Sequence, residues 1–153
     1  MADKYEQGVD VTSPLSVLYC NVVTPEATVL EMAAQFVALP LADGEIGIAP
    51  GHTPLIGRLG YGELRVVEGD KTVILYIDGG FVEVVNNEVG ILTNRAVPAE
   101  KLEEDVAEEQ LKSALAKPAH TPELMAQRDR LQLQARAQLR VARHGKHPSA
   151  AAH

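Results

Sequence analysis

Residues 72–84, TVILYIDGGFVEV, largely determine what kind of fold this chain can adopt. Segments 72–77 and 81–84 alternate in side-chain character with a period of two, which is typical of strands with one buried face. Asp78, Gly79 and Gly80 lie between them and are residue types that favour turns. The stretch therefore predicts two antiparallel strands joined by a turn.

The same pattern covers the first two thirds of the chain. About nine short segments rich in Val, Ile, Leu and Tyr lie between residues 15 and 93, and turn residues such as Asn86 and Asn87 separate them. Eleven of the 12 glycines and all six aromatic residues precede residue 98. Strands at roughly ten-residue spacing without a long helix predict a mainly β domain, either a sandwich or a flattened barrel of antiparallel strands.

After Pro98 the pattern becomes helical. Good helix formers fill 99–117, with acidic residues near the start and lysines near the end, as the helix dipole favours. Thr121 is a suitable N-cap for a second helix over 122–144, which Gly145 can close. The short break between these segments predicts an antiparallel α-helical hairpin.

These patterns divide the chain into four regions. We expect a flexible N-terminal extension (1–14), a β-sandwich domain (15–97), a helical hairpin domain (98–144) and a disordered tail (145–153). The apolar stripes of both helices are narrow and rich in alanine, and alanine contributes little burial energy. The hairpin is therefore expected to be held loosely and to be able to change partners.

The chain carries a net charge of −7 that is unevenly distributed. Residues 121–153 carry +4, whereas the preceding residues carry −11. Arg136, Arg140 and Arg143 share one helix face, because their spacing is i, i+4 and i+7. This face is either a solvated surface or a site for an acidic protein, a nucleic acid or an anionic membrane. The acidic remainder and the lack of aromatics on this helix disfavour nucleic acid, so an acidic protein is the best of the three partners.

Motifs for catalysis, metal binding and cofactor binding are missing from the sequence. It contains no GxxxxGK[ST] motif, and no GxGxxG motif between a strand and a helix, to bind a phosphate. It also lacks the HxxxH and CxxC spacings of metal ligands. The single cysteine, Cys20, lies within a β-branched run. We therefore predict no catalytic residues, no metal site and no cofactor. No apolar run reaches the roughly 18 residues needed to span a bilayer, and residues 1–14 lack the features of a signal peptide. The sequence predicts no direct insertion into a membrane, with the cytoplasm as the default compartment.

Four segments resemble the epsilon subunit of F-type ATP synthase. They are DGEIGIAPGHTPL at 43–55, GELR at 62–65, GGFVEV at 79–84 and VVTPE at 22–26. The resemblance extends from residue 15 to about residue 144. It implies a ten-stranded β-sandwich with a two-helix C-terminal domain, in a non-catalytic central-stalk subunit of the rotor at the cytoplasmic face of the cell membrane.

The resemblance also implies partners and contact residues. The family's sandwich binds the gamma subunit and the polar loops of the membrane c-ring, and thereby helps to couple rotation to proton flow. Glu45 and His52 match its rotor contact. The family's hairpin can press basic residues against an acidic segment of a catalytic beta subunit and slow ATP hydrolysis. Arg136, Arg140 and Arg143 suit that inhibitory contact.

One motif departs from the family pattern. Some bacterial members bind ATP at an [IL]-D-x-x-R-A motif on the first helix, and the matching stretch here is LEEDVA at 102–107. The aspartate is replaced by Glu103 and the arginine by Val106, which removes a bidentate phosphate donor. We therefore predict weak or no nucleotide binding.

An alternative function remains open from the sequence. The chain could be a free-standing β-sandwich ligand-binding module with a dimerising helical hairpin. A stalk subunit needs a flat contact surface around residues 45–55, whereas a small-molecule binder needs a concave apolar pocket there.

Overall fold

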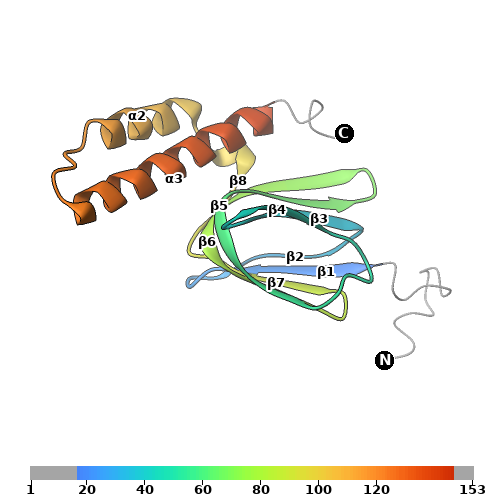
Figure 1. The fold of residues 1–153 in the computed structure, drawn as a ribbon. Coiled ribbons are helices and arrows are strands. Elements are labelled where there is room, and N and C mark those ends of the chain that lie inside the picture. Colours follow the sequence, from blue (N-terminus) through green and yellow to red (C-terminus); the bar gives the residue numbers. More distant parts are fainter. Residues whose placement is uncertain (1–16, 147–153) are drawn as a thin grey trace, which may run out of the picture.

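A computed structural model describes residues 17–146, which form a β-sandwich with a helical hairpin beside one end (Figure 1). The expected N-terminal extension, 1–14, and most of the expected tail lie outside the described residues. The strands are β1 (Leu18–Val23), β2 (Thr28–Ala34), β3 (Phe36–Leu41), β4 (Gly44–Ile48), β5 (Leu55–Glu68), β6 (Lys71–Val85), β7 (Glu88–Leu92) and β8 (Ala96–Pro98).

The long strands β5 and β6 pass through both layers of the sandwich. Residues 55–59 of β5 pair with 80–84 of β6, and residues 61–68 pair with 71–78. At the change of direction Gly79 and Gly80 adopt positive φ angles of 68° and 106°. The turn expected at Asp78–Gly80 is therefore a bend inside one continuous strand, because two successive glycines let the backbone bend without ending the pairing.

Sheet topology confirms the predicted class and refines it. The strand order is β2-β1-β7-β6-β5-β3-β4, with β8 pairing with β6. Residues 17–146 hold eight strands rather than about ten, because two pairs of expected short strands merge into β5 and β6. The strands pair antiparallel, except that β1 pairs with β7 in parallel.

Alternating side chains fill the space between the layers. In β1 the odd-even pattern buries Leu18, Cys20 and Val22 and leaves Tyr19 and Asn21 exposed. The main core consists of sixteen buried residues and comes entirely from the sandwich. Period-two patterning therefore identified the core correctly, and the cysteine is one of its small apolar members.

The hairpin consists of η1 (Ala99–Lys101), α2 (Glu104–Leu115) and α3 (Pro122–Lys146). The single helix expected over 99–117 is split, because Leu102 and Glu103 are extended and Leu102 packs into an apolar cluster on the sandwich. The predicted cap is confirmed: Thr121 Oγ1 accepts a hydrogen bond from the Leu124 N–H at 3.2 Å.

Gly145 has a different role from the expected one. It lies inside α3, which continues to Lys146, so it does not terminate the helix at residue 144. A Cβ atom at Gly145 would lie 2.8 Å from the Cβ of Ala99. The glycine therefore allows α3 to approach η1 closely.

A second, smaller apolar cluster joins the hairpin to the sandwich. Tyr76 of β6 is fully buried beneath Ala99, Ala137 and Val141. Gln134 Nε2 donates to Asp78 Oδ1 at 2.9 Å beside this cluster. The first half of α3 extends beyond the sandwich (Figure 1), so only its second half is docked.

Candidate functional site

Glu45 and His52, the expected rotor contacts, lie along one edge of the sandwich. Glu45 is exposed on β4, which among residues 17–146 pairs only with β3 and is therefore an edge strand. His52 follows in the loop after β4, where its Nδ1 lies 2.7 Å from the carbonyl oxygen of Thr53. About 10 Å of strand separates Glu45 from the end of β4, so the two residues mark separate points on one edge.

The loop that carries His52 is fixed in place. Gly51 has a φ of 83°, which a residue with a side chain rarely adopts. Its N–H donates to Asn87 Oδ1 at 2.8 Å, and Asn87 belongs to the turn between β6 and β7. The proline-glycine-histidine motif is therefore attached to the neighbouring turn, so His52 projects from a fixed position.

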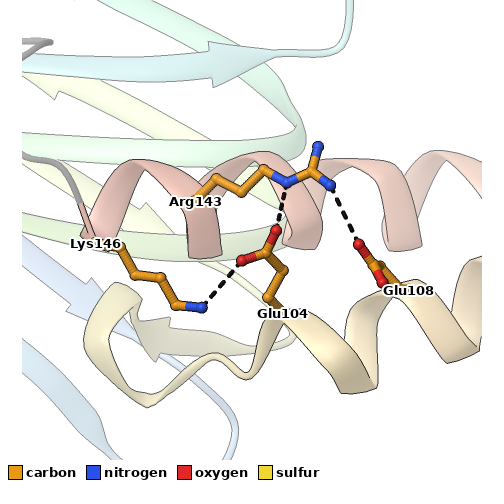
Figure 2. A network of polar contacts seen from close by, with 4 residues as sticks. All are labelled: Glu104, Glu108, Arg143 and Lys146. Carbon is orange, nitrogen blue, oxygen red and sulfur yellow. Dashed lines mark hydrogen bonds and ion pairs between the residues drawn. The ribbon is translucent and has the colours of Figure 1, made fainter.

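The three expected inhibitory arginines occupy two different environments. All three are exposed on α3, but Arg136 and Arg140 form no ion pair within residues 17–146. Arg143 Nε lies 2.7 Å from Glu104 Oε1, and its Nη2 lies 3.3 Å from Glu108 Oε1 (Figure 2). Arg143 thus connects α3 to α2, a partner that the sequence did not reveal.

Lys146 completes this network. Its Nζ donates to Glu104 Oε2 at 3.0 Å, so both oxygens of one carboxylate are occupied (Figure 2). Hydrogen bonds from Arg143 and Lys146 hold the pKa of Glu104 below its ordinary value, and the same contact raises the pKa of Arg143. This network ties α2 to the end of α3.

The degenerate nucleotide motif lies at the start of α2. Glu103 precedes the helix in an extended conformation, and its side chain is exposed. Val106 lies one turn later and is 46% exposed. Neither side chain can donate a hydrogen bond to a phosphate.

A surface that the sequence reasoning missed covers the outer face of β5, β6 and β7. Ile56 is 78% exposed, Phe81 56% and Leu92 54%. Arg58 pairs with Phe81 across β5 and β6, and Phe81 pairs with Leu92 across β6 and β7. Ile56 lies two residues from Arg58 and therefore faces the same side. We call Ile56, Phe81 and Leu92 the apolar face; the charged residues Arg58 and Glu83 lie beside them on the same side.

A sequence signal for this face did exist. Val82 and Val84 are buried in the core, so Phe81 and Glu83 must point outward. Phe81 is therefore a large aromatic at a position where the alternation calls for a polar residue. Exposed large apolar side chains grouped in this way mark contact surfaces.

Three cavities and the possible metal ligands were compared with the expected contact surface at residues 45–55. The cavities of about 520, 310 and 390 Å³ are lined by segments other than 45–55. In the described part of the chain no three His, Cys, Asp or Glu side chains gather as metal ligands would. Within residues 17–146, no helix combines the length and the apolar character that crossing a bilayer requires.

The β-sandwich matches the sandwich domain of a class of ATP synthase subunits. The family model for the "ATP synthase, Delta/Epsilon chain, beta-sandwich domain" matches residues 17–99, more than half of the chain. The chain therefore belongs to the ATP synthase delta/epsilon chain family.

Individual relatives agree with this assignment. The ATP synthase epsilon chain of Rhodopirellula baltica is 46% identical over 124 residues, which cover 81% of this chain and 97% of that protein. The epsilon chain of a Synechococcus species is 40% identical over 97 residues, which cover 63% of this chain and 71% of that protein. Both relatives are named as the epsilon chain of ATP synthase.

Solved structures show the same fold. A chain in the Euglena gracilis mitochondrial ATP synthase structure, which contains OSCP, F1 and the c-ring, aligns with a TM-score of 0.76 at 25% identity, over 84% of this chain and 82% of that chain. A chain in the Tetrahymena thermophila central stalk and c-ring structure aligns with a TM-score of 0.66. The two chains are 13% identical, and the alignment covers 82% of this chain and 96% of that chain. At this identity the second likeness concerns the fold alone.

Proposed function

We propose that this chain is a non-catalytic central-stalk subunit of ATP synthase that joins the gamma subunit to the c-ring. The observation that carries the proposal is the apolar face on a sandwich that already has a complete core of its own. Burying Ile56, Phe81 and Leu92 against a partner would contribute about 1.5–3 kcal/mol for each fully buried side chain. Because the family resemblance implies a gamma contact for the sandwich, we assign this face to gamma, the shaft of the rotor.

The edge that carries Glu45 and His52 suits the second rotor contact. Glu45 is exposed, and the loop of His52 is held in position by the Gly51–Asn87 hydrogen bond. Exposed polar groups on a fixed edge can meet the polar loops of a c-ring, which end at the membrane surface. We therefore place the subunit in the F1 sector, peripheral to the membrane, on the cytoplasmic face of the cell membrane.

Co-purification tests this assignment. A tagged full-length chain expressed in its host should bring down alpha, beta, gamma and the c-ring from solubilised membranes. An Ile56→Asp/Phe81→Asp variant should reduce recovery of gamma by at least about tenfold, because two exposed anchor side chains become charged. Both residues are exposed, so circular dichroism should show an unchanged fold.

A matched control separates a specific contact from general loss of apolar surface. Leu133 on α3 is 57% exposed, much like Phe81. Leu133→Asp should leave the recovery of gamma unchanged. Full recovery with the apolar-face variant, or failure of gamma to co-purify with the unchanged chain, would contradict the proposal.

We also propose that the hairpin is an inhibitory arm directed at an acidic segment of a catalytic beta subunit. Arg136 and Arg140 are exposed and form no ion pair within residues 17–146, so they are available to an acidic partner. Arg143 is already bound to Glu104 and Glu108. An inhibitory contact through Arg143 would first require its ion pairs with Glu104 and Glu108 to break.

Nucleotide binding is not part of the proposed function. Glu103 and Val106 supply no phosphate donor, and both stand where a nucleotide-binding relative carries the motif residues. Isothermal titration of the full chain with ATP should show no binding at micromolar concentrations. Micromolar affinity would contradict this part of the proposal.

A further inference from the structure

The outer face of the sandwich carries a hollow beside the apolar face. Its volume is about 520 Å³, and residues of β1, β2, β6 and β7 line it. Gly90 of β7 is central to this lining, because it pairs with Asn21 of β1 on one side and with Glu83 of β6 on the other. Val89 is buried in the core, so Gly90 faces outward. We call this cavity, whose lining includes Gly90, the Gly90 hollow.

Nothing within residues 17–146 requires a glycine at residue 90. Its φ angle is not positive, so the backbone there would accept a residue with a side chain. A Cβ atom added to Gly90 would meet one heavy atom within 4 Å, the carbonyl oxygen of Glu83, at an ordinary contact distance of 3.8 Å. Glycine inside a strand weakens that strand, and it is typical of positions that a ligand or another chain approaches closely. Gly90 therefore weakens β7 and keeps the hollow open.

The charges around the Gly90 hollow have one sign. Glu31, Glu83 and Glu88 are exposed and belong to its lining. Among residues 17–146 no Lys, Arg or His lines it, and none of the three glutamates forms an ion pair with another described residue. Like charges around a concave surface concentrate a negative potential there. The hollow therefore favours a cationic group.

A side chain of a partner protein suits the hollow better than a metal ion or a small molecule. In the described part of the chain no three His, Cys, Asp or Glu side chains come close enough to hold a metal. Small-molecule pockets are mostly apolar, whereas this lining contains three carboxylates and Asn21. Lysine and arginine combine a long apolar stem with a charged end. The stem can lie along Tyr19 and Val85, which also line the hollow, while the charged end meets the carboxylates.

The Gly90 hollow is continuous with the apolar face. Leu92 follows Gly90 by two residues on the same side of β7, and Phe81 precedes Glu83 in the same way on β6. Residues two apart along a strand are separated by about 7 Å. A partner that covers Phe81 and Leu92 therefore reaches the hollow with a neighbouring side chain.

We propose that the Gly90 hollow receives a lysine or arginine side chain of the partner that covers the apolar face. This inference rests on the proposed function, in which that partner is gamma. The apolar side chains anchor the partner, and the hollow fixes its position along the sheet. Arg58 lies beside Phe81 on β5, a strand that does not line the hollow, and repels a basic group there. Attraction on one side of the apolar face and repulsion on the other select one orientation of the partner.

Filling the hollow should separate binding from folding. In the tagged full-length chain, Gly90→Val places a β-branched side chain in a strand, so the midpoint of urea unfolding should stay the same or rise. Recovery of gamma from solubilised membranes should nevertheless fall by at least about tenfold, because the hollow is occupied. Gly90→Ala adds a smaller side chain and should lower recovery less. Thr72→Val is the control: it places the same side chain at an exposed position at the other end of β6 and should leave recovery unchanged.

Replacing carboxylates tests the chemistry of the occupant. Glu31→Gln/Glu83→Gln should lower the recovery of gamma by about threefold to tenfold at low salt. The same variant should weaken the salt dependence of recovery, because the attraction that salt screens is lost. Glu68→Gln/Asp70→Asn is the matched control, since it removes two exposed acidic charges at the turn between β5 and β6. It should change neither the recovery nor its salt dependence.

The possible outcomes distinguish this inference from the proposed function. Full recovery of gamma with Gly90→Val, or lower urea midpoints in both Gly90 variants, would overturn the hollow as a contact. A loss with Gly90→Val but unchanged recovery and salt dependence in the double glutamine variant would overturn the basic side chain. If gamma is lost with Ile56→Asp/Phe81→Asp in either case, the rotor contact stands and this inference alone fails. If the unaltered chain recovers no gamma, both fail.

Discussion

Among the glycines of residues 17–146, Gly80 leaves the least room for a side chain. Its φ is 106°, and a Cβ placed there would lie 1.9 Å from the carbonyl oxygen of Leu92 in β7. Both the backbone angle and the contact exclude a side chain. This glycine allows β6 to bend from one layer into the other while it stays paired with β7.

Gly80→Ala should therefore strongly destabilise the sandwich. Strain at the backbone angle and overpacking against Leu92 should together lower the free energy of unfolding by about 3–5 kcal/mol. Urea unfolding followed by circular dichroism measures this change.

Gly69→Ala is the matched control for that variant. Gly69 also has a positive φ, 58°, but an added Cβ would meet nothing within 4 Å. Gly69→Ala should therefore lower the free energy of unfolding by only about 1 kcal/mol. Equal losses in the two variants would mean that the backbone angle, and not the approach to Leu92, explains the requirement for glycine at residue 80.

Whole strands and helices show how far the sequence could predict this fold. Alternation identified the buried faces of β1, β6 and β7, and the cap at Thr121 set the start of α3. The bend at Gly79–Gly80 looked like a turn because a turn and a bent strand use the same residue types. The parallel pairing of β1 with β7 joins segments about seventy residues apart in the chain, and local patterns carry no information about it.

Contacts between elements were harder to predict than the elements. The three arginines were placed on one face by their spacing, and all three are exposed on α3. That Arg143 pairs with Glu104 depends on how α2 packs against α3, which helix periodicity does not specify. Tyr76 beneath Val141 likewise depends on the docking of the hairpin.

The ion-pair network at Glu104 should make the stability of α2 packing on α3 depend on pH. Its pKa is lowered in the folded state, so its contribution is present above the ordinary range of a carboxyl group and is lost as the pH falls through the lowered value. Glu104→Gln should remove this contribution. At pH 7 the exchange of the α2 amides should then become about twofold to fivefold faster, as expected for a surface network.

Glu109→Gln controls for the loss of a charge on the same helix. Glu109 is exposed and forms no ion pair within residues 17–146. Hydrogen exchange of α2 should be unchanged in this variant. If both variants speed up exchange equally, the change in helix charge rather than the Arg143–Lys146 network is responsible.

At the scale of the whole molecule, residues 17–146 form two apolar clusters that share no residue. The large cluster lies between the layers of the sandwich, and the small cluster holds the hairpin through Tyr76, Ala99, Ala137 and Val141. The large cluster contains no residue of the hairpin, so separating the hairpin leaves the core of the sandwich intact. The sandwich should therefore remain folded when the hairpin leaves it.

Removing the hairpin tests what it does in the assembled complex. A chain that ends at Lys101 keeps β8 paired with β6 and keeps the apolar face and the edge with Glu45 and His52. It should still assemble with gamma and the c-ring. If the hairpin inhibits, ATP hydrolysis by the assembled complex should rise by several fold.

A substitution then separates the arginines from the rest of the hairpin. Arg136→Ala/Arg140→Ala removes the two arginines that are free of ion pairs within residues 17–146. This double variant should raise hydrolysis nearly as much as truncation, because the acidic partner then has neither arginine to bind. Arg130→Ala, an exposed arginine on another face of α3, should have no effect. Unchanged hydrolysis after truncation would show that the hairpin does not inhibit. A rise with truncation but not with the double variant would place the inhibitory contact elsewhere on the hairpin, with Arg143 as the next residue to test once its hold on Glu104 is broken.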